Sequence, residues 1–179
     1  MIEYFLCLYA SDQDGEVDGG SVVLPVMMGI GFNVINIAIR RCAPDRSGGF
    51  LCMAELDGTP VLTVRCGNPP PAKKHLYLNC CQEKAQRLAI YRDHVLSAQS
   101  RDLTVCQYAG AVRCRHHILS FSGLPEYLDE AAMLVLGILA GELSEVEGRR
   151  HALITSNQFL EILLEECKRS PSCSSFFKK

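Results

Sequence analysis

Two spacings of apolar residues run along the chain, and each predicts a type of element. An apolar run of about 18 residues, from Val22 to Ile39, ends on Arg40 and Arg41, whose charges suit a helix C-terminus. The run also holds a proline, two glycines and two asparagines. We therefore expect a buried amphipathic helix here rather than a helix that spans a membrane.

The clearest strands lie in the next part of the chain. Phe50 to Leu56 and Val61 to Arg65 are apolar runs, and the Asp57 and Gly58 between them form a pair typical of tight β-turns. Three prolines follow shortly afterwards, and a proline can neither donate to a strand ladder nor continue a strand. This segment therefore predicts an antiparallel hairpin.

The rest of the chain predicts helices and shorter strands. A helix from about Ala72 to Ala98 has an apolar and a polar side, and Glu83, Lys84 and Arg87 fall on the polar one. Pro125, followed by acidic residues, indicates the start of another long helix. That helix continues through Ala131–Leu139. The remaining predicted elements are strands at Leu103–Tyr108, Ala109–Cys114 and Ile118–Phe121, and an amphipathic final helix at Ala152–Cys167.

Together these elements predict one α+β domain, an antiparallel sheet of about five strands with helices on its faces and an extra C-terminal helix. A length of 179 residues suits a single domain. We expect an N-terminal extension at residues 1–20, the domain at residues 21–168 and a flexible tail at residues 169–179.

Composition and charge exclude several classes of protein. Apolar residues make up 48% of the chain and charged residues 21%, which excludes an intrinsically disordered chain. The net charge is −2 and the basic residues are scattered, so no nucleic-acid surface is expected. The apolar first ten residues lack a positive region and are followed by acidic residues, so we expect no targeting segment.

The ten cysteines favour a cytoplasmic location. None forms a C-x-x-C pair, and several take the place of an apolar residue in a predicted strand or helix. Most are therefore interpreted as small buried apolar residues in a reducing compartment. A redox or metal role for the adjacent Cys80 and Cys81 stays open, although neighbouring side chains on a helix point about 100° apart.

Short motifs occur in a fixed order between about Asn33 and Gly141. The hairpin is followed by a helical motif, by a pair of small residues, and by a strand that ends shortly before an acidic helix start. This order resembles the GlcG/HbpS family of haem-binding or haem-degrading domains and the related C-terminal domain of PduO-type proteins. The residues that carry it are Gln82, Glu83, Lys84, Ala85, Ala109, Gly110, Ser122, Gly123 and Asp129.

The resemblance implies a profilin-like core that commonly forms homo-oligomers and binds haem, iron or a corrinoid, with weak haem-degrading activity in some members. Lys84, Ser122 and Gly123 are then candidate ligand-binding residues. Ser122 has a simpler alternative role, which is to cap the helix that follows it. The other motif residues are interpreted as structural, namely Gln82, Glu83, Ala85, Gly110 and Asp129.

His116 and His117 are the candidate ligands for haem iron. They form the only pair of adjacent histidines, and imidazole is a natural axial ligand of haem. Successive strand residues point to opposite sides, so at most one of the two serves a given site. The alternative is an exposed pair that binds no ligand.

Common catalytic signatures are missing from the sequence. It contains no G-x-S-x-G, no phosphate loop ending in G-K, no H-E-x-x-H and no G-x-G-x-x-G after a strand. Two hypotheses remain. The first is a binding domain for haem, a corrinoid or a similar small molecule. The second is a non-catalytic homo-oligomer that uses its sheet and helices for docking.

Overall fold

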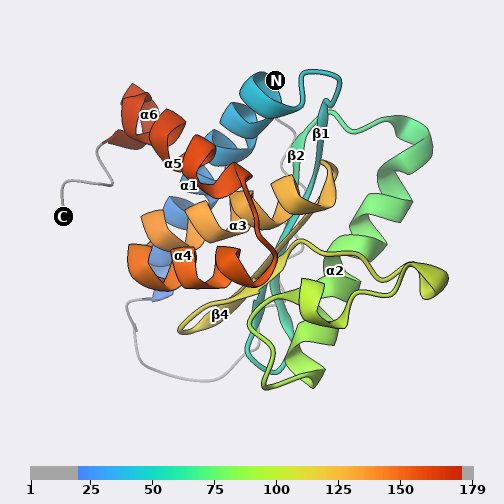
Figure 1. The fold of residues 1–179 in the computed structure, drawn as a ribbon. Coiled ribbons are helices and arrows are strands. Elements are labelled where there is room, and N and C mark those ends of the chain that lie inside the picture. The colour runs from blue at the N-terminus through green and yellow to red at the C-terminus, as the bar shows by residue number, and fades with distance from the viewer. Residues whose placement is uncertain (1–19, 175–179) are drawn as a thin grey trace.

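The computed structural model describes residues 20–174, in which a four-stranded sheet lies between helices (Figure 1). Three short 3₁₀ turns complete the elements. The helices are α1 (Gly20–Cys42), α2 (Lys74–Ile90), α3 (Glu126–Leu139), α4 (Glu145–Ile154), α5 (Phe159–Arg169) and α6 (Pro171–Ser174). The strands are β1 (Gly48–Glu55), β2 (Pro60–Gly67), β3 (Ala111–Arg113) and β4 (His117–Ser122), and the turns are η1 (Pro71–Lys73), η2 (Ser97–Ser100) and η3 (Leu103–Val105).

All neighbouring strands are antiparallel, in the order β2-β1-β4-β3. The predicted hairpin is confirmed as β1 and β2, with Phe50 opposite Arg65. The prediction of about five strands is wrong, because Leu103–Tyr108 does not form a strand. There Asp102 accepts a hydrogen bond from the backbone N–H of Thr104 at 2.9 Å, which starts η3.

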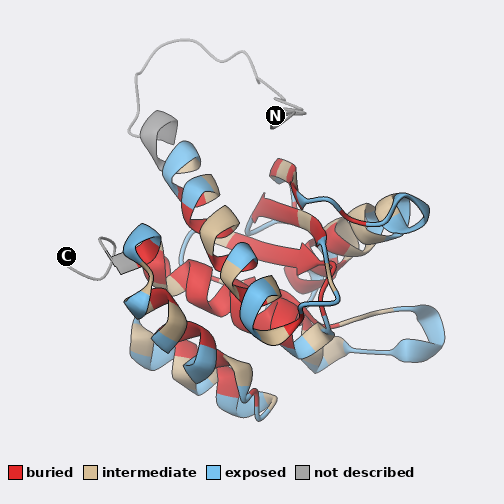
Figure 2. Ribbon diagram, turned by 90° about the horizontal axis from the view of Figure 1, so that it is seen from above, coloured by how far each residue is buried: buried red, intermediate tan, exposed pale blue. Residues whose placement is uncertain are grey.

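The two faces of the sheet pack against different helices. Alternate residues of β1 divide between them: Leu51 and Met53 join the larger core with α1 and α3, whereas Cys52 and Ala54 face α2. Helices α4 and α5 pack on α3 from outside (Figure 1). The sheet and α3 are therefore the most completely buried part of the molecule (Figure 2).

Small residues fill the contact between α2 and the sheet. The two thiols Cys52 and Cys81 lie there with Ala54 and Ala85, and all four are buried. Cys66, Cys114, Cys167 and Cys173 are buried as well, and the cysteines of the described part of the chain carry no disulfide. Their interpretation as small apolar residues agrees with these positions.

The long helix that was predicted to reach about Ala98 ends at Ile90 instead. Arg113 of β3 provides the physical reason, because its guanidinium donates hydrogen bonds to the carbonyl groups of Leu88, Tyr91 and His94. A cation that binds the last carbonyls of a helix satisfies groups that have no intrahelical partner.

The single final helix predicted at Ala152–Cys167 is in fact two helices, α4 and α5. Ser156 between them has a φ of 53°, which breaks the helical path. Asn157 then accepts a hydrogen bond from the N–H of Phe159 at 3.0 Å and so starts α5. Helix α4 begins at a Ser144–Glu147 capping box, earlier than the apolar pattern predicts.

The structure describes only part of the expected N-terminal extension and C-terminal tail. The described part of the expected flexible tail contains α6. Cys173 of this helix is buried against the core. The expected extension at residues 1–20 lies almost wholly outside the described residues, as do residues 175–179. Within residues 20–174, no helix combines the length and the apolar character needed to cross a membrane.

Candidate functional site

A groove of about 410 Å³ opens where α2 faces the turn between β4 and α3. It adjoins a hollow of about 320 Å³, and four residues, Arg46, Lys73, Tyr77 and Gly123, line both. We call the larger one the Lys84 groove. Its other lining residues are Leu76, Cys80, Lys84, Tyr108, Ser122, Leu124, Pro125, Glu126 and Asp129.

An ion pair between Lys84 and Asp129 forms the floor of this groove. The Lys84 Nζ lies 3.0 Å from Asp129 Oδ2 and also donates a hydrogen bond to the carbonyl of Phe121 at 2.8 Å. The two side chains are only 1% and 2% exposed. A charged pair this deeply buried is costly unless each partner is well satisfied, and here each has at least two partners.

Asp129 also fixes the shape of the turn above it. Its Oδ1 accepts a hydrogen bond from the backbone N–H of Leu124 at 2.9 Å. Burial raises the pKa of the Asp129 carboxyl to about 6, while Lys84 and the turn N–H groups act in the opposite direction. The carboxylate is therefore ionised at neutral pH, and it joins α2, α3 and the β4–α3 turn.

Gly110 leaves the space that the ion pair occupies. A Cβ at this position would lie 2.7 Å from the Asp129 Cβ and 2.8 Å from the Lys84 Nζ, and its φ is +122°. Gly123 is confined in a similar way, since a Cβ there would lie 2.5 Å from the carbonyl oxygen of Gly48. Both glycines are therefore required by close contacts at the groove.

Ser122 does not cap α3. It is the last residue of β4 and is 6% exposed, and the residue that precedes the first turn of α3 is Pro125. The capping role expected for Ser122 is therefore wrong. Ser122 and Gly123 instead form part of the groove wall, beside Glu126.

The four motif residues of α2 make two kinds of contact. Gln82 donates a hydrogen bond to Thr63 Oγ1 of β2 at 3.5 Å, and Ala85 is buried against the sheet. Glu83 accepts a hydrogen bond from the Nε of Arg87 at 2.6 Å. In this motif only Lys84 lines the groove, so the structural interpretation of the other three residues agrees with their contacts.

The burial of Arg87 was not predicted from the sequence pattern. Arg87 was expected on the polar side of its helix, as was Lys84, but both are buried, and Arg87 is 4% exposed. The Arg87 guanidinium donates hydrogen bonds to the carbonyl groups of Ser97, Ser100 and Tyr108 at 2.6, 3.0 and 2.5 Å. It thereby fastens residues 97–108, including the groove residue Tyr108, to α2.

His116 and His117 lie away from the groove, in and after the turn between β3 and β4. Ser122 lies five positions after His117 along β4, which corresponds to about 16 Å at the rise of a strand. The His117 Nδ1 lies 2.9 Å from Glu142 Oε1, and the His116 N–H donates to Glu142 Oε2. The candidate site residues therefore separate into the groove set and this histidine pair.

Cys80 and Cys81 point to different places, as expected for neighbours on a helix. Cys80 lines the groove, and burial raises the pKa of its thiol. Cys81 lies against the sheet, where its Sγ donates a hydrogen bond to the carbonyl of Phe50 at 3.0 Å. No cluster of three or more histidine, cysteine or acidic side chains suited to a metal ion occurs within residues 20–174.

The lining of the groove is partly apolar and aromatic, and it contains no histidine. Leu76, Tyr77 and Tyr108 provide apolar and aromatic surface, whereas no imidazole lies among the lining residues. Comparison with protein-family models, with curated proteins and with solved structures finds no match for this chain. The resemblance to GlcG/HbpS domains therefore rests on the short motifs alone.

Proposed function

We propose that this protein is a small-molecule-binding module and that its ligand occupies the Lys84 groove. One observation carries the proposal: five residues from three separate segments of the chain meet at the Lys84 groove. Lys84 and Asp129 form its floor, Gly110 makes room for them, and Ser122 and Gly123 line its wall. Grooves that combine apolar walls with a few fixed polar groups are typical ligand sites.

The proposed ligand class is a haem-like or corrinoid-like flat cofactor, as the GlcG/HbpS resemblance implies. With it we propose a profilin-like core, which the antiparallel sheet with helices on both faces supports. Leu76 is 53% exposed beside Tyr77, so a flat ring can cover apolar surface that faces water in the structure. Iron coordination by the histidine pair is not part of the proposal, because that pair lies elsewhere.

Titration with haemin tests this proposal. We expect a Soret shift at micromolar haemin that remains in a His116→Ala, His117→Ala double variant, because these residues do not line the groove. Leu76→Gln is expected to weaken haemin binding about fivefold, since about 1 kcal/mol of apolar contact is lost. Ile90→Gln is the matched control, because Ile90 is exposed at the other end of α2.

Two results would contradict the proposal. One is the absence of a Soret shift at micromolar haemin. The other is a shift that the double histidine variant abolishes and Leu76→Gln leaves unchanged, since this pattern would place the ligand at the β3–β4 turn.

Homo-oligomer formation is a second candidate function, favoured by an apolar surface on α4. Val146, Leu153 and Ile154 are 59%, 76% and 52% exposed there. Exposed apolar residues on one short helix are frequent at protein interfaces. Size-exclusion chromatography with light scattering is expected to show an oligomer that a Leu153→Glu, Ile154→Glu variant converts to monomer. A monomeric wild-type protein would contradict this function.

A further inference from the structure

The acidic residues of the Lys84 groove are already paired with cations of the protein. Asp129 is paired with Lys84. Glu126 lies 2.7 Å from the Nε of Arg101 and also accepts a hydrogen bond from the N–H of Ala109 at 3.0 Å. Burial would raise the pKa of Glu126, but these partners hold it below its usual value, so the carboxylate is stable as an anion. The charges of both carboxylates are therefore already neutralised by cations of the protein.

Two cationic side chains remain at the junction of the groove and its adjoining hollow. Arg46 and Lys73 line both spaces. Arg46 forms an ion pair with Asp45 at 3.4 Å, but its buried Nε has no hydrogen-bond partner among the described residues. Asp45 offsets one of the two cations, so one positive charge is left in excess. This local excess contrasts with the net charge of −2 of the whole chain.

The backbone around this junction also favours negative charge. Helix α3 has 14 residues and begins at the groove residue Glu126, so the positive end of its dipole faces the groove. The excess positive charge of Arg46 and Lys73 and the N-terminal end of α3 together attract an anion. The apolar wall beside them suits a ring.

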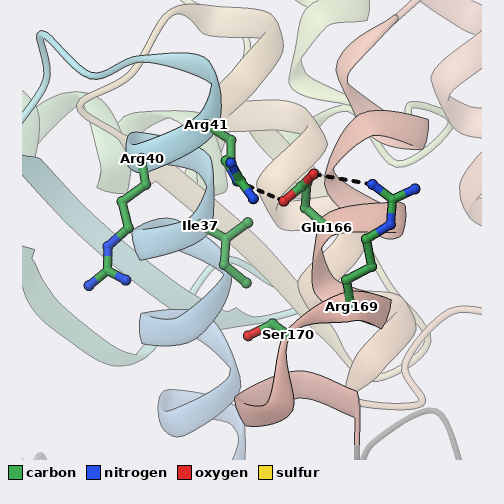
Figure 3. A pocket seen from close by; sticks show the side chains of 6 residues that line it. All are labelled: Ile37, Arg40, Arg41, Glu166, Arg169 and Ser170. Atoms are coloured by element: carbon green, nitrogen blue, oxygen red, sulfur yellow. Dashed lines mark ion pairs between the residues drawn. The ribbon is translucent and has the colours of Figure 1, made fainter.

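A second arginine-lined hollow, of about 350 Å³, provides the comparison (Figure 3). There Arg41 and Arg169 both point to Glu166, at 2.7 and 3.5 Å, and so are already paired. The hollow lies at the C-terminal ends of α1 and α5, where helix dipoles repel anions. Arg40, Arg41 and Arg169 all lie in the last turns of these helices, where a positive charge complements the helix dipole.

From this contrast we infer that the ligand of the Lys84 groove carries an anionic group, such as a carboxylate, sulfonate or phosphate, that binds Arg46 and Lys73. The inference rests on the proposed function and names the chemistry by which the same groove selects its ligand. The apolar part of the ligand then lies toward Leu76, Tyr77 and Tyr108, and the anionic group lies where the two spaces meet.

Two fluorescent probes test the inference. The first is 1-anilinonaphthalene-8-sulfonate, a ring system with one sulfonate, and the second is the uncharged N-phenyl-1-naphthylamine. In an Arg46→Ala, Lys73→Ala variant we expect about tenfold weaker binding of the anionic probe, because two charged contacts are lost. The uncharged probe is expected to change less than twofold.

Two further variants give the matched controls. Arg40→Ala, Arg169→Ala removes the same charge from the hollow of Figure 3, and it is expected to leave both affinities unchanged. Arg46→Lys, Lys73→Arg keeps the charges and is expected to retain most of the affinity for the anionic probe.

The outcomes distinguish the anionic subsite from the ligand groove as a whole. Equal loss of both probes in the Arg46→Ala, Lys73→Ala variant, or no loss of either, would overturn the anionic subsite and leave the groove as the ligand site. Loss of the anionic probe in the Arg40→Ala, Arg169→Ala variant would move the anion site to the other hollow. If Leu76→Gln changes the affinity of neither probe, the proposed function itself fails.

Discussion

Replacing Lys84 with methionine is expected to lower the free energy of unfolding by about 3–5 kcal/mol. The substitution keeps the apolar stem of the side chain but removes the ammonium group, so the Asp129 carboxylate stays buried with the N–H groups of the β4–α3 turn as its remaining partners. Urea unfolding followed by circular dichroism at neutral pH measures the effect. Lys73→Met is the matched control, because Lys73 is exposed, and a change within about 0.5 kcal/mol is expected for it.

A double-mutant cycle shows whether the effect comes from the ion pair. Asn at position 129 keeps an oxygen that accepts from the Leu124 N–H but carries no charge. Lys84→Met combined with Asp129→Asn is therefore expected to cost about 2 kcal/mol less than the sum of the two single changes. Single effects that simply add would show that Lys84 stabilises the fold by packing alone.

Replacing Arg87 with methionine is expected to lower the free energy of unfolding by about 3 kcal/mol or more. The carbonyl groups of Ser97, Ser100 and Tyr108 lose their donor. These hydrogen bonds are buried or partly buried, so water does not fully replace the guanidinium. Arg87→Lys is expected to restore little, since one ammonium group cannot reproduce the spread of a planar guanidinium. The same variants are expected to show faster amide hydrogen exchange across residues 97–108.

Arg92→Met is the control for this prediction, because Arg92 is exposed just beyond the end of α2. A change within about 0.5 kcal/mol is expected for it. Equal stability of the Arg87→Met and Arg92→Met proteins, or unchanged exchange across residues 97–108, would show that the Arg87 hydrogen bonds do not hold this segment in solution.

Local patterns were enough to predict β1, β2 and α1. The Asp57–Gly58 pair forms the expected turn, in which Gly58 has a φ of +93° and Asp57 accepts a hydrogen bond from the N–H of Thr59 at 2.8 Å. These features depend on residues that are neighbours in the sequence. The end of α2 was not predictable in this way, because it is set by Arg113, a residue more than twenty positions later.

The buried charges of α2 were missed for a similar reason. Lys84 and Arg87 are three residues apart, a spacing that on an isolated helix indicates a polar face in water. Here residues 97–110 and the β4–α3 turn cover that face, and neither segment has a regular apolar spacing. A helix face can therefore look exposed in the sequence and still form the floor of a groove.

The candidate site was predicted in part. Lys84, Ser122 and Gly123 all line the groove, although the interpretation of Ser122 as a helix cap was wrong. The wall residues Leu76, Tyr77 and Tyr108 carried no motif, and only the fold brings them together. His116 and His117 were candidates because of their chemistry, and the structure places them toward the other end of β4 from the groove.

Close packing between α2 and the sheet makes this helix the less mobile side of the proposed ligand groove. Cys52, Ala54, Cys81 and Ala85 are buried there together with Leu88 and Ile118, and close-packed interiors deform little. The facing residue Tyr108 follows residues 101–106, which are all exposed. Residues 101–106 are therefore the part beside the groove that is expected to move, between the fixed points that Arg87 makes at Ser100 and Tyr108.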